Sequence, residues 1–149
     1  MARLTEDNVR IAQEIISRYP RPRSATIPLL HLAQEQDGYV TEEAMAHIGE
    51  LVGASSAEVY GTASFYEMFK FEPIGKYCVN VCTNISCMLC GSDKIVDHVE
   101  RKLGIKTGES TPDGKFFLKR EEECLAACNN APMMMIDHVY YEHLTPEKV

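Results

Sequence analysis

Tryptophan is absent from this sequence of 149 residues, and so is any dense run of lysine or arginine. The formal net charge is -7 at pH 7, because 22 acidic residues outnumber 15 basic ones. Nucleic acids and anionic lipid surfaces are bound through clustered positive charge. The composition therefore predicts a protein that binds neither of them.

A long uninterrupted apolar stretch is also missing, and this bears on where the protein works. The first residues read MARLTEDNVRIAQEII, so acids interrupt the positions at which a secretory signal or a membrane-spanning helix needs apolar side chains. We therefore expect no direct membrane insertion and a location in the cytoplasm, where thiols stay reduced. A processed organellar chain would instead lie in the mitochondrial matrix.

The third absence is a glycine-rich phosphate loop, the feature by which many proteins hold nucleotide cofactors. Without such a loop, the chain has no evident place of its own for NADH or a flavin. We therefore expect hydride chemistry to take place on a partner.

Residues 1–72 have the pattern of short helices. Apolar residues recur at helical spacing between positions 9 and 19, and a second helix is expected over 24–38. The segment 41–53 begins with acids and ends at a glycine, as helices do. Ser55 and Glu58 then have the spacing of a capping box that starts a further helix. This part is predicted to be a small helical bundle.

Residues 73–149 change to the pattern of an α/β domain. KYCVNVC alternates with a period of two, which places Val79 and Val81 on one face of a strand. A helix capped by Ser92 and closed by Gly104 is expected next, followed by strands at KFFLKRE, MMMID and VYYEH. The predicted fold class is therefore α+β, with a helical bundle before an α/β domain that contains a four-stranded sheet. The final residues, TPEKV, predict the start of another helix.

Four of the six cysteines form two tight pairs. Cys82 and Cys87 are separated by four residues in VCTNISC, and Cys124 and Cys128 by three in ECLAAC. Each pair follows a predicted strand, so loops that leave the strand ends can bring both pairs to one edge of the sheet. Four thiolates are the usual ligands of a 2Fe-2S cluster, and the spacing differs from the repeated two-residue gap of a zinc ribbon.

The segments around these cysteines carry a family resemblance. VCTNISCMLCGSD and ECLAACNNAPMMMID resemble the thioredoxin-like 2Fe-2S subunit of respiratory complex I, and EVYGTASFYEMF resembles the N-terminal region of that family. The resemblance implies a thioredoxin-like fold after the helical bundle and a cis peptide bond at Ala131-Pro132. It also implies that one 2Fe-2S cluster is held by Cys82, Cys87, Cys124 and Cys128.

The same resemblance implies a function as an enzyme subunit of an NADH:quinone oxidoreductase. The chain would exchange single electrons with the FMN of a partner, so that FMN and NADH bind only to that partner subunit. Other subunits of the peripheral arm would be further partners and would hold the chain at the inner face of the membrane. NAD-linked hydrogenases and formate dehydrogenases contain related subunits, and these hosts are alternatives.

Cys90 departs from the family pattern, because relatives more often carry a residue such as arginine there, whereas here CMLC forms a two-residue-gap pair with Cys87. A thiol-disulfide oxidoreductase that uses Cys87 and Cys90 is an alternative, but it leaves Cys124 and Cys128 without a role. A zinc-stabilised interaction module with one ion on the four paired cysteines is another. We expect Cys78 and Cys90 to be small apolar core residues.

Two further groups of residues bear on electron transfer. Backbone N–H groups of 83–86 and 125–127, with the helix N-terminus at Ser92, are expected to ease the negative charge of a cluster. Phe65, Tyr66, Met68 and Phe69 crowd together in the helical part. They form either a docking surface or a portion of the helical bundle's own core.

Overall fold

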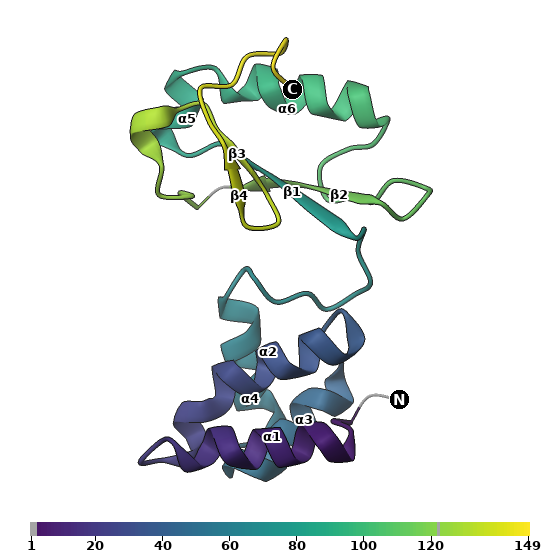
Figure 1. Cartoon of the computed structure of the whole chain (residues 1–149), viewed down its shortest axis with the longest axis vertical. Coiled ribbons are helices and arrows are strands. Elements are labelled where there is room, and N and C mark those ends of the chain that lie inside the picture. The colour runs from purple at the N-terminus through teal and green to yellow at the C-terminus, as the bar shows by residue number, and fades with distance from the viewer. Residues whose placement is uncertain (1–2, 122) are drawn as a thin grey trace. The chain divides into compact units, whose positions relative to one another are not determined.

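The computed structural model of the chain describes residues 3–121 and 123–149. The chain separates into two compact units, Met1–Pro73 and Ile74–Val149 (Figure 1). The described residues of the first unit form helices, and those of the second combine helices with one four-stranded sheet. These elements confirm the predicted α+β class with an N-terminal helical part.

The helical unit has a single apolar core. Its elements are α1 (Glu6–Ser17), the 3-10 helix η1 (Pro22–Ala25), α2 (Thr26–Asp37), α3 (Glu42–Val52) and α4 (Ser56–Phe65). Leu29, Leu30, Ile48 and Val59 are fully buried where these helices meet. The helix expected over 24–38 begins instead with the 3-10 helix, and α2 follows with Pro28 in its first turn. A proline is tolerated there because the first backbone N–H groups of a helix have no partner within the helix.

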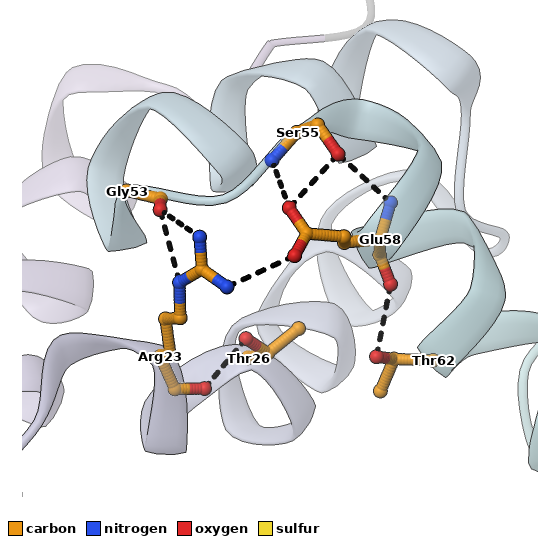
Figure 2. A network of polar contacts seen from close by, with 6 residues as sticks. All are labelled: Arg23, Thr26, Gly53, Ser55, Glu58 and Thr62. Atoms are coloured by element: carbon orange, nitrogen blue, oxygen red, sulfur yellow. Dashed lines mark hydrogen bonds and ion pairs between the residues drawn. The ribbon is translucent and has the colours of Figure 1, made fainter.

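A polar network fixes the start of α4 (Figure 2). Ser55 Oγ accepts a hydrogen bond from the Glu58 N–H at 3.3 Å, and the Glu58 carboxylate accepts one from the Ser55 N–H at 2.8 Å. This is the predicted capping box. Arg23 donates to the Gly53 carbonyl from Nε at 3.0 Å and from Nη2 at 2.7 Å, and it pairs with Glu58 at 2.9 Å. One side chain thus joins η1, the end of α3 and the start of α4.

The Glu58 carboxylate predicts an acid-sensitive contribution to stability. Hydrogen bonds from Ser55, followed by the charge of Arg23, hold the pKa of Glu58 below its ordinary value of 4.5. A carboxyl group with a lowered folded-state pKa stabilises the folded chain above its unfolded pKa, and this contribution is lost as the pH falls through the folded pKa. We expect Glu58→Gln to destabilise the helical unit at pH 7 and to flatten the fall in stability below about pH 4.5.

Urea unfolding of wild type and variant, followed by circular dichroism between neutral and acidic pH, measures this difference. Glu35→Gln makes the same chemical change at an exposed position of α2 and serves as the control. The same pH dependence of stability in wild type and Glu58→Gln would show that the Glu58 carboxylate makes no acid-sensitive contribution.

The second unit is built on a mixed sheet. Its elements are β1 (Tyr77–Cys82), α5 (Ile85–Leu89), α6 (Ser92–Leu103), β2 (Phe116–Glu121), the 3-10 helix η2 (Cys128–Asn130), β3 (Met134–Ile136) and β4 (Val139–Tyr141). The strand order is β2-β1-β3-β4, in which β1 and β2 are parallel and the other neighbours are antiparallel. The chain segment that contains α5 and α6 is the crossover between the two parallel strands.

The core of this unit lies between α6 and one face of the sheet. It is formed by buried aliphatic side chains of α6, β1 and β2, namely Ile95, Val96, Val99, Val79, Val81 and Leu118. Val79 and Val81 therefore share the buried face that the alternation predicts. Gly104, with φ of 69°, ends α6 as predicted, because a left-handed residue closes the last turn.

Two local predictions in this unit are wrong. Ser92 is the first residue of α6 and not its cap, a position that Gly91 takes with φ of 88°. The Ser92 hydroxyl is buried and has no hydrogen-bond partner among the described residues. At the C-terminus, 146–148 form a turn in which the Lys148 N–H bonds the Thr145 carbonyl at 2.9 Å. This bond joins residues three apart and closes a single turn, whereas an α-helix needs bonds between residues four apart.

No helix in the described ranges 3–121 and 123–149 combines the length and the apolar character needed to cross a membrane.

Candidate functional site

The parallel strands bring the four paired cysteines to one edge of the sheet. Cys82 is the last residue of β1 and lies opposite Glu121, the last residue of β2. Cys87 follows in α5, and Cys124 and Cys128 follow β2. The carboxyl ends of parallel strands meet at the same edge. The Thr83 N–H and hydroxyl both donate to the Glu121 carbonyl, at 2.8 and 3.1 Å, and so join the starts of the two cysteine loops.

The first pair is buried in apolar surroundings. Cys82 and Cys87 are each 2% exposed and pack with buried Met133, and partly buried Leu125 lies against this group. Burial raises the pKa of the Cys87 thiol to about 11, the neighbouring Cys82 thiol adds to the rise, and the Met133 N–H opposes it. The metal-free chain therefore keeps Cys87 protonated at neutral pH, so a metal must displace that proton on binding.

The second pair is exposed, at the two ends of a loop whose Leu125 and Ala127 are partly buried. The Cys124 and Cys128 sulfurs are 3.1 Å apart, and the Ala126 N–H donates to Cys124 Sγ at 3.3 Å. The pKa of Cys124 is lowered, first by its hydrogen bond with the Cys128 thiol and then by the N–H of Ala126. The pKa of Cys128 is raised, first by its bond to Cys124, and the Ser86 hydroxyl opposes the rise. The Ser86 hydroxyl thus links the two cysteine loops.

The sulfurs are arranged as two pairs and not as one tetrahedral set. Within 3–121 and 123–149, no three His, Cys, Asp or Glu side chains converge on a single-ion site. A structural zinc ion needs all four ligands around one centre, whereas a 2Fe-2S cluster takes two ligands at each of its irons. The donors present therefore fit a two-iron cluster better than a single ion.

The short helix α5 was not among the elements expected from the sequence. Asn84 caps it by accepting the Ile85 N–H at 2.7 Å, and asparagine at this position was the available signal. The helix turns Cys87 into the protein and leaves Ile85, Met88 and Leu89 exposed.

Cys78 and Cys90, the two cysteines outside the proposed ligand set, differ from the expectation that both lie in the core. Cys90 is exposed, so that prediction is wrong for it. It occupies the C-cap of α5, next to exposed Leu89. Cys78 is half-buried, and its sulfur lies 3.2 Å from the side-chain oxygen of Asn80.

Two other features lie near the cysteine loops. The peptide bond between Ala131 and Pro132 is cis, as the family resemblance implies. The Tyr140 hydroxyl of β4 donates to the Leu125 carbonyl, inside the second cysteine loop, at 2.7 Å. No local sequence signal marks Tyr140, because the contact joins residues that only the folded sheet brings together.

The aromatic group of the helical unit is divided between core and surface. Phe69 is buried and lies against the His31 ring at 4.9 Å between centroids, and Tyr66 packs on the core. Phe65 is 77% exposed and Met68 is also exposed. Neither of the two expected roles therefore holds for the whole group.

Comparison with known proteins places this geometry in a family. The family model for thioredoxin-like 2Fe-2S ferredoxins matches residues 12–149. The E subunit of the NADH-quinone oxidoreductase of Mycobacterium tuberculosis is 43% identical over 147 residues, which cover 99% of this chain and 56% of that protein. The corresponding E subunit of Rickettsia felis is 45% identical over 145 residues, which cover 95% of this chain and 86% of that protein. The chain thus spans about half the length of the mycobacterial relative.

A solved structure shows the same fold. An NAD+-reducing [NiFe]-hydrogenase in the air-oxidised state superposes with a TM-score of 0.67 at 22% identity, over 83% of this chain and 21% of that one. The family match, the relatives and the paired thiols at one sheet edge agree with the resemblance carried by the cysteine segments. The chain belongs to the thioredoxin-like 2Fe-2S ferredoxin family.

Proposed function

We propose that this chain is the electron-transfer subunit of an NADH-quinone oxidoreductase and holds one 2Fe-2S cluster on Cys82, Cys87, Cys124 and Cys128. The observation that carries the proposal is the pairing of the four thiols at the carboxyl ends of two parallel strands. Relatives of 43 and 45% identity that are named as subunits of this oxidoreductase support this host complex. When bound, such a cluster accepts and releases one electron at a time.

The chain's own residues supply the surroundings that such a cluster needs. Buried Met133 and partly buried Leu125 keep water from the first pair, and the Ala126 N–H donates to the Cys124 sulfur. Other expected donors are engaged elsewhere, since the Thr83 N–H bonds the Glu121 carbonyl and the Ile85 N–H bonds the Asn84 side chain. The backbone support for a reduced cluster therefore comes from fewer groups than the loop sequences indicate.

We further propose that the partner is the subunit that binds FMN and NADH and that α5 is part of the surface it covers. Residues 77–92 contain no charged side chain, in a chain of which a quarter is charged. Within that segment, Ile85 and Leu89 of α5 are 68 and 77% exposed. An exposed, uncharged apolar helix beside the ligand loop suits a water-excluding contact with a redox partner.

A charge at Leu89 is expected to disrupt this contact. Leu89→Glu should leave the cluster in place and weaken binding to the FMN subunit by about tenfold or more, because an unpaired carboxylate would be buried in the interface. Pull-down and calorimetry with the FMN subunit of the same organism measure the effect. Ile11→Glu, at an exposed position of α1, is the matched control. Equal affinity of Leu89→Glu and wild type for the FMN subunit would contradict the proposal that α5 lies in the interface.

The test of the function itself is an anaerobic visible and EPR spectrum of the purified chain before and after dithionite. Iron, sulfide and zinc are counted on the same sample. A red-brown oxidised protein that becomes EPR-active on reduction, with about two irons per chain, is the expected result. A colourless protein with about one zinc, and no recovery after reconstitution with iron and sulfide, would contradict the proposal and favour the zinc module.

The host complex and the location are part of the same proposal. We place the chain in the peripheral arm, held by its partner subunits at the cytoplasmic face of a bacterial membrane. Residues 1–72 and 73–149 would be its two domains, the second of which holds the cluster. Purification of the native complex decides between hosts, because an NAD-linked hydrogenase or formate dehydrogenase would bring a different catalytic subunit with the chain.

A further inference from the structure

We propose that Tyr140 is a positioning residue that tunes the reduction potential of the cluster by fixing the peptide unit whose N–H binds the Cys124 sulfur. This inference rests on the proposed function, since it takes Cys124 as a cluster ligand. It adds a residue outside both cysteine loops to the groups that control the site.

Two hydrogen bonds meet on one peptide unit. The Tyr140 hydroxyl donates to the Leu125 carbonyl at 2.7 Å, and the Ala126 N–H donates to Cys124 Sγ at 3.3 Å. The Leu125 carbonyl and the Ala126 N–H belong to the same planar group, so they point in opposite directions and rotate together. A hydroxyl that holds the carbonyl therefore also aims the N–H at the sulfur.

This peptide unit needs outside support. Ala126 has φ of 62°, in the left-handed region that residues with a side chain seldom adopt. Such a conformation persists where the surroundings impose it. The two cysteines that flank the loop are exposed, so burial does not hold the loop at its ends. The hydrogen bond from Tyr140 is a specific contact that holds the loop.

Tyr140 itself is held by the sheet. It lies opposite Met135 of β3, and Met135 lies opposite Asn80 of β1. Two residues after Asn80, β1 ends at Cys82 of the buried pair. The Tyr140 hydroxyl thus ties the exposed loop to the sheet, whose strand β1 also positions the first pair of sulfurs.

The consequence concerns the charge that reduction adds. An N–H donated to a ligand sulfur stabilises the more negative, reduced form, so hydrogen bonds to sulfur raise the reduction potential. A hydroxyl that donates to the carbonyl of the same peptide polarises its N–H and strengthens that bond. Removal of the hydroxyl should therefore make the potential more negative without removing any ligand.

Tyr140→Phe tests this, because it keeps the ring and the strand and removes only the hydroxyl. We expect unchanged iron content and a midpoint potential shifted to more negative values in an EPR-monitored titration of the reconstituted full chain. In the metal-free, nitrogen-15-labelled chain, we expect a shifted Ala126 amide resonance with faster hydrogen exchange. Tyr141→Phe is the control, since adjacent residues of a strand point to opposite faces of the sheet.

The outcomes separate this inference from the proposed function. An unchanged potential and an unchanged Ala126 amide in a variant that carries the cluster would overturn the inference alone. If Tyr140→Phe folds but loses the cluster, a changed Ala126 amide in the metal-free chain supports the inference and an unchanged one overturns it. A wild-type chain that takes up no iron and sulfide would overturn the proposed function, and the tuning role would fall with it.

Discussion

Cys82→Ala and Cys124→Ala are each expected to abolish the visible spectrum and the EPR signal of the reconstituted chain, whereas Cys90→Ala leaves both unchanged. Each of the first two changes takes one thiolate from a pair, and the iron that this pair holds then loses half of its protein ligands. Cys90 is exposed at the C-cap of α5, whereas Cys87 is buried. It can therefore change without loss of a ligand.

Iron and sulfide per chain, measured after anaerobic reconstitution, check this result. Circular dichroism of the metal-free variants shows whether each one is folded, and half-buried Cys78 provides a second control as Cys78→Ala. Loss of the cluster in Cys90→Ala, together with retention in Cys124→Ala, would mean that the ligand set is wrong. Thiol-disulfide exchange by the metal-free chain that disappears in Cys90→Ala alone would favour the oxidoreductase alternative.

Gly75→Ala is expected to destabilise the α/β unit by about 3 kcal/mol, near the upper end of the usual cost of overpacking. A Cβ at this position would lie 2.3 Å from the carbonyl carbon of Phe116 and 2.7 Å from the nitrogen of Phe117. Both are backbone atoms of β2, and Tyr77 of β1 is paired with Phe116 in the sheet. The new methyl group can be accommodated only if the edge strand β2 shifts away from the segment that leads into β1. Because these strands end at the cysteine loops, cluster content should fall as well.

Gly61→Ala provides the matched control for this prediction. Gly61 lies inside α4, and a Cβ there meets no atom within 4 Å. An alanine in a helix interior without a clash stabilises a chain by about 0.5–1 kcal/mol, chiefly because the unfolded chain loses freedom. Urea unfolding of the metal-free chain, followed by circular dichroism, compares the two variants. If Gly75→Ala is as stable as wild type, the backbone of β2 at Phe116 and Phe117 can move aside without a measurable cost in free energy.

Local pattern predicted the elements whose cause is local. The alternation around Val79 and Val81 identifies β1, because a strand with one buried face needs apolar side chains at every second position. The capping box of Ser55 and Glu58 marks the start of α4, and Gly104 marks the end of α6, since each feature satisfies the helix's own unpaired backbone groups. The pairing of the cysteines pointed to the cofactor, and the family resemblance supplied the name of the fold.

The sequence by itself thus determined most of the elements, their order and the residues available to hold a cluster, but not the short helix α5. Only the tertiary structure decided that Cys82 and Cys87 are buried while Cys124 and Cys90 are exposed. It also decided which backbone N–H groups reach a sulfur and which bond to Glu121 or Asn84, and it brought Tyr140 to the second cysteine loop. The physical reason is that burial and hydrogen bonding depend on what lies across the sheet. Those neighbours come from distant parts of the chain, which no local spacing reveals.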